Sequence, residues 1–184
     1  METDYTNIKV HPLFEPIKKL FEFVIFGSGF MAMPDFQREF LNINPAAKSV
    51  IDGYNKEVKL TIKGSEVHTN IQPYLVYVGR LMAIAIFDFL QFSPYHKCLC
   101  QTEIFKFVKH IRNGAAHNNK FFFYAKNKKE LLKKPVVWKN KVIESSLMGK
   151  TVISDFINPI ELLFLMQDIS KLIKAKQAIK QSQP

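Results

Sequence analysis

The stretch Thr102–His117, TEIFKFVKHIRNGAAH, decides the fold class, because its apolar residues recur with the period of an α-helix. At about 100° per residue they fall on one side, as the core-facing stripe of an amphipathic helix does. These residues are Ile104, Phe107, Val108, Ile111 and Ala115. A second, polar stripe at spacings of four, three and four holds Lys106, His110, Asn113 and His117. The stretch therefore predicts a helix, begun by Thr102 or a neighbour, with titratable groups along one edge.

Further helices are predicted on both sides of this stretch. Three precede it, over residues 12–27, 44–63 and 73–92, and the glycines at 27 and 29 end the first of them. A last helix follows, capped by Ser154 or Asp155 and apolar on a wide face as far as Ile173. Because each helix has an apolar face to bury, together they predict a helical bundle.

A short β segment is predicted between the last two long helices. Residues 135–138 and 141–144 alternate around the turn Lys139-Asn140, which predicts a hairpin, and residues 151–153 predict a further strand. The expected fold is an all-α bundle with a small β-hairpin insertion before the last long helix. We expect one domain over residues 1–184, with flexible tails at 1–11 and 177–184.

The chain is strongly basic, with 26 Lys and Arg against 16 Asp and Glu and a net charge of +10. Such a surface attracts polyanions, with nucleic acid first and an anionic membrane second. Residues 120–150 hold nine lysines and two acids. The candidate RNA-binding residues are Lys106, Lys109, His110, Lys120, Lys126, Lys128 and Lys129. The interleaved aromatics, residues 121–124 and Trp138, either stack on RNA bases or belong to the core.

Membrane, metal and cofactor sites are not expected. Residues 74–92 are long and apolar enough to raise the question of a span, but Arg80 and Asp88 interrupt them and favour a buried helix of a soluble bundle. Arg80 either pairs with a buried carboxylate or serves the site, and its partner is open. Cys98 and Cys100 form neither a disulfide framework nor a zinc pattern, and no signal peptide is recognisable. We expect reduced thiols in the cytoplasm, no metal and no cofactor.

Arg112, Asn113 and His117 bring phosphate chemistry to the end of the motif helix. Arginine offers a charged, planar fork of donors, and histidine as a residue type titrates near neutrality. Arg112 and His117 point about 140° apart on an ideal helix, so Arg112 must reach across or the helix must bend near Gly114. The alternative is purely structural, with the arginine at a helix edge and the histidine as a cap.

The residues Arg112-Asn113-Gly114-Ala115-Ala116-His117 resemble the R-x4–6-H signature of HEPN domains, in particular the Abi-like (abortive infection) branch. This resemblance, over residues 12–176, implies a helical homodimer that acts as a metal-independent endoribonuclease in prokaryotic phage defence or a toxin–antitoxin system. It implies His117 as general acid/base, Arg112 as stabiliser of the phosphorane charge, Asn113 as an orienting group, and 2′,3′-cyclic phosphate ends. An antitoxin or defence-system partner is a further expectation.

One position departs from the family pattern. Some HEPN toxins carry a tyrosine two residues after the histidine, which their antitoxin modifies, and this chain has Asn119 there. That form of regulation is therefore in doubt. Two alternatives stay open: a non-catalytic HEPN-like module for RNA binding or dimerisation, and a membrane-associated basic helical protein.

Overall fold

The computed structural model describes residues 8–31, 72–123, 132 and 134–181. The chain divides into two compact units, one of residues 1–19 with 75–184 and one of residues 20–74. Most of the second unit, including the helix predicted over residues 44–63, lies outside the described residues. The single domain therefore stays a prediction, and the first unit carries the motif.

Helices make up most of the described residues, as the sequence predicted. They are α1 (Glu15–Met31), α4 (Gln72–Gln91), α5 (His96–Leu99), α6 (Glu103–Ala116) and α7 (Pro159–Gln181), with short 3₁₀ helices η2 (Pro12–Phe14) and η3 (Ser145–Leu147). The strands β1 (Val136–Trp138) and β2 (Lys141–Ile143) pair antiparallel, with Val137 opposite Val142. A predominantly helical fold with one small hairpin is confirmed. No helix in the described part of the chain is long and apolar enough to cross a membrane.

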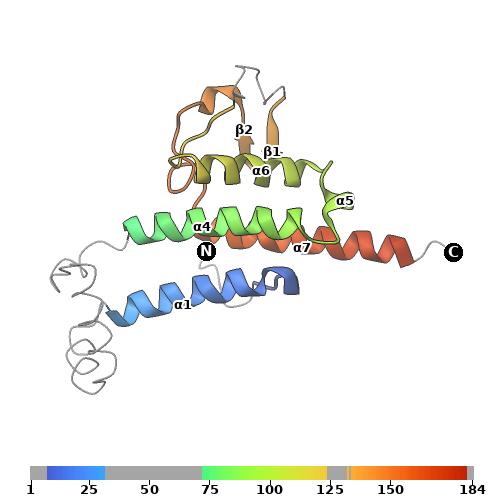
Figure 1. The fold of residues 1–184 in the computed structure, drawn as a ribbon, viewed down its shortest axis with the longest axis horizontal. Helices are drawn as coiled ribbons and strands as arrows, with labels where there is room; N and C mark the ends of the chain where they lie inside the picture. Colours follow the sequence, from blue (N-terminus) through green and yellow to red (C-terminus); the bar gives the residue numbers. More distant parts are fainter. Residues whose placement is uncertain (1–7, 32–71, 124–131, 133, 182–184) are drawn as a thin grey trace. The chain divides into compact units, whose positions relative to one another are not determined.

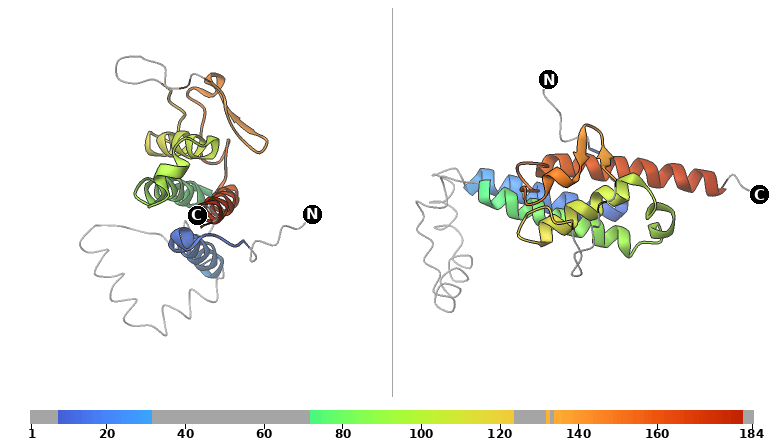
Figure 2. Two further views of the ribbon diagram at one scale, coloured as in Figure 1. Left: turned by 90° about the vertical axis from the view of Figure 1, so that its right-hand side faces the viewer. Right: turned by 90° about the horizontal axis from the view of Figure 1, so that it is seen from above.

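The elements of the first unit stack in layers around α6. Helix α6 lies over α4 and runs back along it, while the hairpin covers the other side of α6 with β1 against the helix (Figures 1 and 2). Helix α7 runs beside α4 in both figures. The core between these layers is almost wholly apolar, and its fully buried side chains include Phe107, Ile86, Leu90, Ile111 and Met166.

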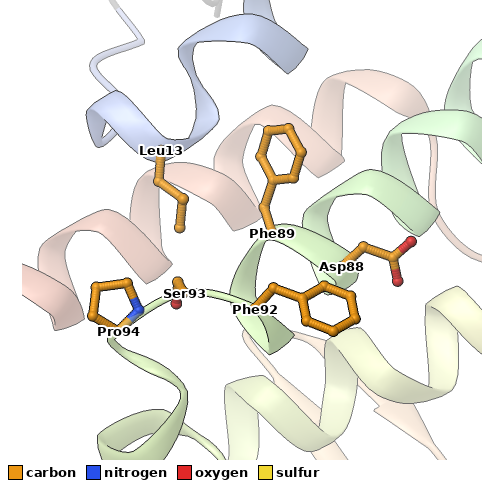
Figure 3. Close-up of a pocket in the computed structure, with 6 residues that line it drawn as sticks. All are labelled: Leu13, Asp88, Phe89, Phe92, Ser93 and Pro94. Atoms are coloured by element: carbon orange, nitrogen blue, oxygen red, sulfur yellow. The ribbon is translucent and has the colours of Figure 1, made fainter.

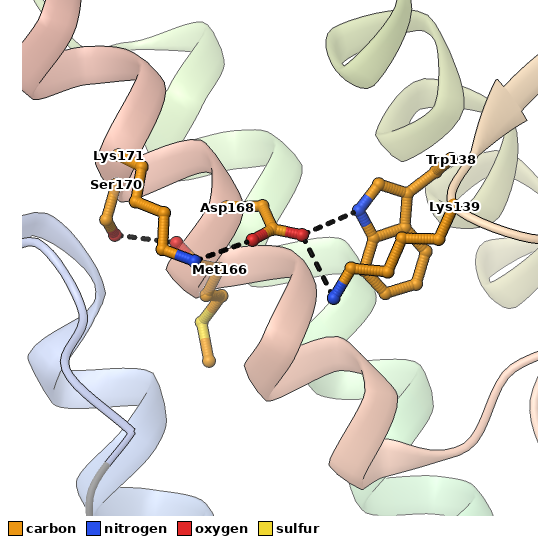
Figure 4. Close-up of polar contacts among 6 residues, drawn as sticks. All are labelled: Trp138, Lys139, Met166, Asp168, Ser170 and Lys171. Carbon is orange, nitrogen blue, oxygen red and sulfur yellow. Dashed lines mark hydrogen bonds and ion pairs between the residues drawn. The ribbon is translucent and has the colours of Figure 1, made fainter.

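The hairpin contacts α7 through two carboxylates: Lys141 Nζ of β2 lies 2.9 Å from Glu161 Oε1, and Asp168 binds the turn (Figure 4). Its Oδ2 accepts from Trp138 Nε1 at 3.2 Å and lies 3.1 Å from Lys139 Nζ, while Oδ1 lies 3.3 Å from Lys171 Nζ. Burial alone would raise the pKa of Asp168, but the hydrogen bonds from Lys139 and Lys171 outweigh it and lower the pKa. Lys139 therefore has a structural partner within the chain.

The aromatic residues of the basic segment belong mainly to the core. Phe121, Phe123 and Trp138 are buried, and the Trp138 ring lies 5.5 Å from Phe107 between centroids. Phe122 is exposed, and residue 124 lies outside the described residues. The interpretation as core is confirmed for the three buried rings, which are not accessible to stack on RNA.

Two predicted helix ends and one predicted strand are wrong. Helix α1 continues through the glycines at 27 and 29 to Met31, since a helix tolerates an interior glycine at a cost of about 1 kcal/mol. Helix α7 begins at Pro159, because Asn158 and Glu161 exchange backbone-to-side-chain hydrogen bonds of 2.9 Å as a capping box. Residues 151–153 form only isolated bridges, to Lys120 and Ile157, rather than a strand.

Both predicted tails are shorter than expected. Ile8 and Val10 are buried, and the His11 N–H donates to Ser170 Oγ on α7 at 2.6 Å. At the other end α7 reaches Gln181, and Gln177 Nε2 donates to the Tyr95 hydroxyl at 3.0 Å. Residues 8–11 and 177–181 are therefore part of the folded unit.

Candidate active site

Helix α6 forms as its sequence predicts and positions the motif at its C-terminal end. Thr102 is the N-cap, with Oγ1 accepting from the Phe105 N–H at 3.3 Å. The buried face differs by one residue from the prediction, because Phe105 is buried and Ile104 only partly so. The helix ends at Ala116, and the His117 N–H closes the last turn onto the Asn113 and Gly114 carbonyls.

Gly114 lets the end of α6 pack against two other segments. A Cβ at this position would overlap the Val152 Cγ2 methyl and lie 3.2 Å from the Lys120 carbonyl oxygen. Helix α6 continues unbroken through Gly114 to Ala116, so the glycine provides close approach rather than a break in the helix. The bend near Gly114, one of the two ways in which Arg112 was expected to approach His117, is therefore not present.

Two asparagines in the left-handed region reverse the chain after the motif. Asn118 and Asn119 have φ of 54° and 59°, a conformation that asparagine adopts more readily than most residues. The Asn119 side chain pairs with the backbone of Ile153 in both directions, Nδ2 to O at 2.9 Å and N to Oδ1 at 2.8 Å. Asn119, which stands where some HEPN toxins have a tyrosine, therefore ties the end of the motif to Ile153.

Arg112 lies against α4 and uses few of its hydrogen-bond donors on the described residues. Its Cζ is 5.6 Å from the Phe87 ring centroid, Nη1 donates to Asn113 Oδ1 at 3.5 Å, and Nη2 is 4.0 Å from Asp88 Oδ1. Nε is buried and has no partner among the described residues. A guanidinium has five N–H donors, so this one is held by stacking and by charge rather than by a full set of hydrogen bonds.

Arg80 holds the last turn of α6 from the side of α4. Its Nε donates to the Ala115 carbonyl at 2.8 Å, which satisfies one of the free carbonyls at a helix end and places a cation near the negative end of the helix dipole. The partner that the sequence left open is therefore a backbone oxygen. Both charges that interrupt the apolar helix, Arg80 and Asp88, contact the motif helix.

His117 stands apart from the other two motif residues. Its side chain is exposed, and within the described part of the chain no hydrogen bond or ion pair joins the imidazole to Arg112 or Asn113. The structure thus brings Arg112, Asn113 and Asp88 together, whereas the exposed His117 imidazole is not joined to them by a hydrogen bond or ion pair among the described residues. Asp88 and Phe87 were missed as site residues, although the charge of Asp88 inside an apolar helix was an available signal, whereas a role for Arg80 at the site was one of the two alternatives that the sequence left open.

The predicted RNA-binding residues fall into three groups. Lys106, Lys109 and Lys120 are exposed, and Lys106 forms an ion pair of 2.7 Å with Glu103. His110 packs edge-on against Phe123 at 5.7 Å between ring centroids, and burial, aided by the charge of Lys109, lowers its pKa. The remaining three, Lys126, Lys128 and Lys129, lie outside the described residues.

The described residues contain no group of three or more histidine, cysteine or acidic side chains arranged to hold a metal ion. Cys98 and Cys100 are instead engaged locally, with their thiols donating to the Tyr95 and Lys97 carbonyls at 3.1 and 3.6 Å. The arrangement at the end of α6 can bind an anion through Arg112 and exchange a proton through His117. In comparisons with protein-family models, characterised proteins and solved structures, the chain matches none.

Proposed function

We propose that the chain is a HEPN-like, metal-independent endoribonuclease that acts as a homodimer in prokaryotic defence, against phage or within a toxin–antitoxin pair. The observation that supports this most is the Arg112 guanidinium, which is fixed on Phe87 and makes one hydrogen bond of 3.5 Å in the described part of the chain. A cation with vacant donors is suited to a phosphate, which accepts such a fork bidentately.

The proposed reaction is attack by a ribose 2′-hydroxyl on the adjacent phosphate. It needs a base for the 2′ proton, an acid for the leaving 5′-oxygen, and a positive charge for the phosphorane oxygens. His117 supplies the proton transfers and Arg112 the charge. Asn113, whose amide oxygen already contacts Arg112 at 3.5 Å, orients the phosphate or the guanidinium. The products carry 2′,3′-cyclic phosphate and 5′-hydroxyl ends.

The position of His117 supports the proposal of a homodimer. One imidazole cannot be base and acid at once, and the exposed His117 has no hydrogen bond to Arg112 in the described part of the chain. A second copy that faces the first across its motif helix brings two histidines and two arginines into one cleft. The exposed Lys109 and Lys120 add positive charge for the RNA backbone.

The test is cleavage of single-stranded RNA by the purified protein in excess EDTA. We expect the wild type to produce cyclic phosphate ends. The cleavage rate of His117→Ala should be lower by about 100-fold or more, which is the typical contribution of general acid–base catalysis. Arg112→Lys keeps the charge but loses the planar fork, so it separates a role in phosphate binding from a role in folding. His96→Asn and Lys176→Ala are the matched controls, and both should cleave as the wild type does.

The nuclease is refuted if the wild-type protein leaves every RNA intact, or if His117→Ala cleaves normally while circular dichroism shows it folded. Light scattering on the same samples tests the dimer, and a monomer at the concentration of the cleavage assay contradicts a shared site. In cells, expression of the wild type but not of His117→Ala should reduce phage plaque numbers.

A second function is a non-catalytic HEPN-like module that binds RNA or dimerises. The observation in its favour is the same separation of His117 from Arg112, since a binding module needs the cation but no proton donor. RNA binding by the wild type that Arg112→Ala weakens and His117→Ala leaves unchanged, without cleavage in either case, would support this function.

A further inference from the structure

Asp88 links the guanidinium of Arg112 to an apolar pocket at the end of α4. Its Oδ1 lies 4.0 Å from Arg112 Nη2. The pocket has a volume of about 500 Å³ and is lined by Leu13, Asp88, Phe89, Phe92, Ser93 and Pro94 (Figure 3). Pockets that hold small organic groups usually measure about 300–1,000 Å³. A planar group bound in or beside this pocket would be separated from Arg112 only by the Asp88 side chain.

Phe92 offers a flat surface for such a group. Its side chain is 86% exposed, the highest value among the large apolar side chains that the structure describes. It follows Asp88 by one helical turn, with its N–H on the Asp88 carbonyl at 3.0 Å, and both side chains extend from the same side of α4 (Figure 3). Stacking of a nucleobase on an exposed aromatic ring of this kind is favourable for any of the four bases, because every base has a flat π-face.

Among the described residues, the Asp88 carboxylate accepts as few hydrogen bonds as the Arg112 guanidinium donates. Closed guanidinium–carboxylate pairs have N···O distances of about 2.7–2.9 Å, whereas this pair stays 4.0 Å apart. No other described residue donates to the Asp88 carboxylate, which is 43% exposed. The guanidinium and the carboxylate thus lie side by side without a close hydrogen bond between them. This arrangement suits a ligand with an acidic part for Arg112 and a separate hydrogen-bond-donating part for Asp88.

We infer that Asp88 and Phe92 form a base-reading subsite that selects an unpaired guanine next to the phosphate at Arg112. Guanine alone among the four bases presents two adjacent donors, N1–H and N2–H₂, which match the two oxygens of a carboxylate. Adenine and cytosine offer one amino group, and the uracil N–H lies between two carbonyl oxygens that a carboxylate repels. The subsite rests on the proposed function for the presence of RNA, but it concerns selection and not cleavage.

The experiment measures binding and not turnover, so that it separates the two proposals. Fluorescence anisotropy of the full chain is recorded with uncleavable 2′-O-methyl strands of about seven uridines. The strands are all-uridine or carry one central guanosine or one central inosine, which lacks the 2-amino group. The variants are Asp88→Asn and Phe92→Ala, with Glu144→Gln as the matched exposed carboxylate and Phe23→Ala as the matched exposed phenylalanine.

We expect the guanosine strand to bind about tenfold or more tightly than the all-uridine strand, and inosine to lose most of that gain. Asp88→Asn should bind the guanosine and all-uridine strands with equal affinity, Phe92→Ala should weaken every strand, and both controls should behave as the wild type. This pattern in a protein that cleaves no RNA would support the subsite while refuting the nuclease.

Three results overturn the inference. One is equal affinity of the wild type for the guanosine and all-uridine strands, including no binding of either. Another is an Asp88→Asn variant that weakens all strands equally, because the carboxylate would then act only on Arg112. The third is a Phe92→Ala variant whose mass in light scattering shows loss of a dimer, because the ring would then belong to an interface between copies.

Discussion

Replacement of Gly114 by alanine tests whether α6 is held by close packing at its motif end. In a helix interior alanine is favoured over glycine by about 1 kcal/mol. Against this, the new methyl overlaps Val152 Cγ2, and Val152 is fully buried with a stiff, β-branched side chain. Overpacking of this kind costs about 1–3 kcal/mol. The net effect of Gly114→Ala should therefore be a loss of about 0–2 kcal/mol of unfolding free energy.

The clash itself is isolated by a double-mutant cycle with Val152→Ala. That substitution alone costs about 2 kcal/mol, because it removes two buried carbons and leaves a cavity. Once Val152 Cγ2 is gone, only the 3.2 Å contact with the Lys120 carbonyl remains, so Gly114→Ala should become neutral or stabilising. We expect a coupling free energy of about 1–3 kcal/mol between the two sites.

The free energy of unfolding is measured in urea for the wild type, the two single variants and the double variant. Circular dichroism monitors the helices, and fluorescence monitors Trp138, the only tryptophan. Coincident transitions by the two probes justify two-state free energies. If Gly114→Ala destabilises the protein by the same amount with valine or alanine at position 152, the methyl–methyl overlap is not the reason for the glycine. The interpretation of Gly114 as a close-packing residue is then refuted.

Three further predictions concern the supports of the site. Asn119→Ala should lower the free energy of unfolding in urea by about 2–4 kcal/mol, since it strains the left-handed backbone and leaves the Ile153 backbone without its partner. The control is Asn118→Ala, at a residue with φ of 54°, which should show only the cost of backbone strain. Equal losses for the two variants would contradict a role for the Asn119–Ile153 hydrogen bonds. Asp168→Ala should change the wavelength of Trp138 emission and cost about 1–3 kcal/mol, because Trp138 Nε1 loses its acceptor. The substitution Asp155→Ala, at an exposed position, should not change the emission. Burial, and to a lesser extent the charge of Lys109, lowers the pKa of His110 from its ordinary value of 6.5. The unfolded chain therefore binds this proton first, and stability should fall as the pH drops below about 6.5; His110→Gln should reduce this dependence, and an unchanged slope would contradict it.

Local signals were sufficient for α4, α6 and the hairpin. Apolar periodicity, the Thr102 cap, and the Lys139-Asn140 turn between alternating segments all act over a few residues, so the sequence predicts their bounds closely. The start of α7 was missed because Ser154, Asp155 and Asn158 are all good caps. Only Asn158 has a proline after it and a glutamate three residues on, and that combination was the stronger signal.

The site was predictable only in part, since its contacts depend on the register between two helices. Arg112, Asn113 and His117 stand in one short motif and were named from it. The contacts of Arg80 with Ala115 and of Asp88 with Arg112 join residues far apart in the chain. Periodicity does not fix which turn of α4 faces which turn of α6, because the register arises from side-chain packing between helices.

Backbone hydrogen bonds of Phe121 bring together the two ends of a long segment between α6 and α7. The Phe121 N–H bonds to the Lys150 carbonyl at 2.9 Å, and the Gly149 N–H returns to the Phe121 carbonyl at 2.9 Å. The residues between them therefore add nothing to the span that connects the two helices. Because the chain leaves and rejoins the bundle at one point, residues inserted between these two contacts would not lengthen the path from α6 to α7. The buried Trp138 and Ile143 would still hold the hairpin against the bundle, so a change of loop length and a change of core packing are separate events in this part of the chain.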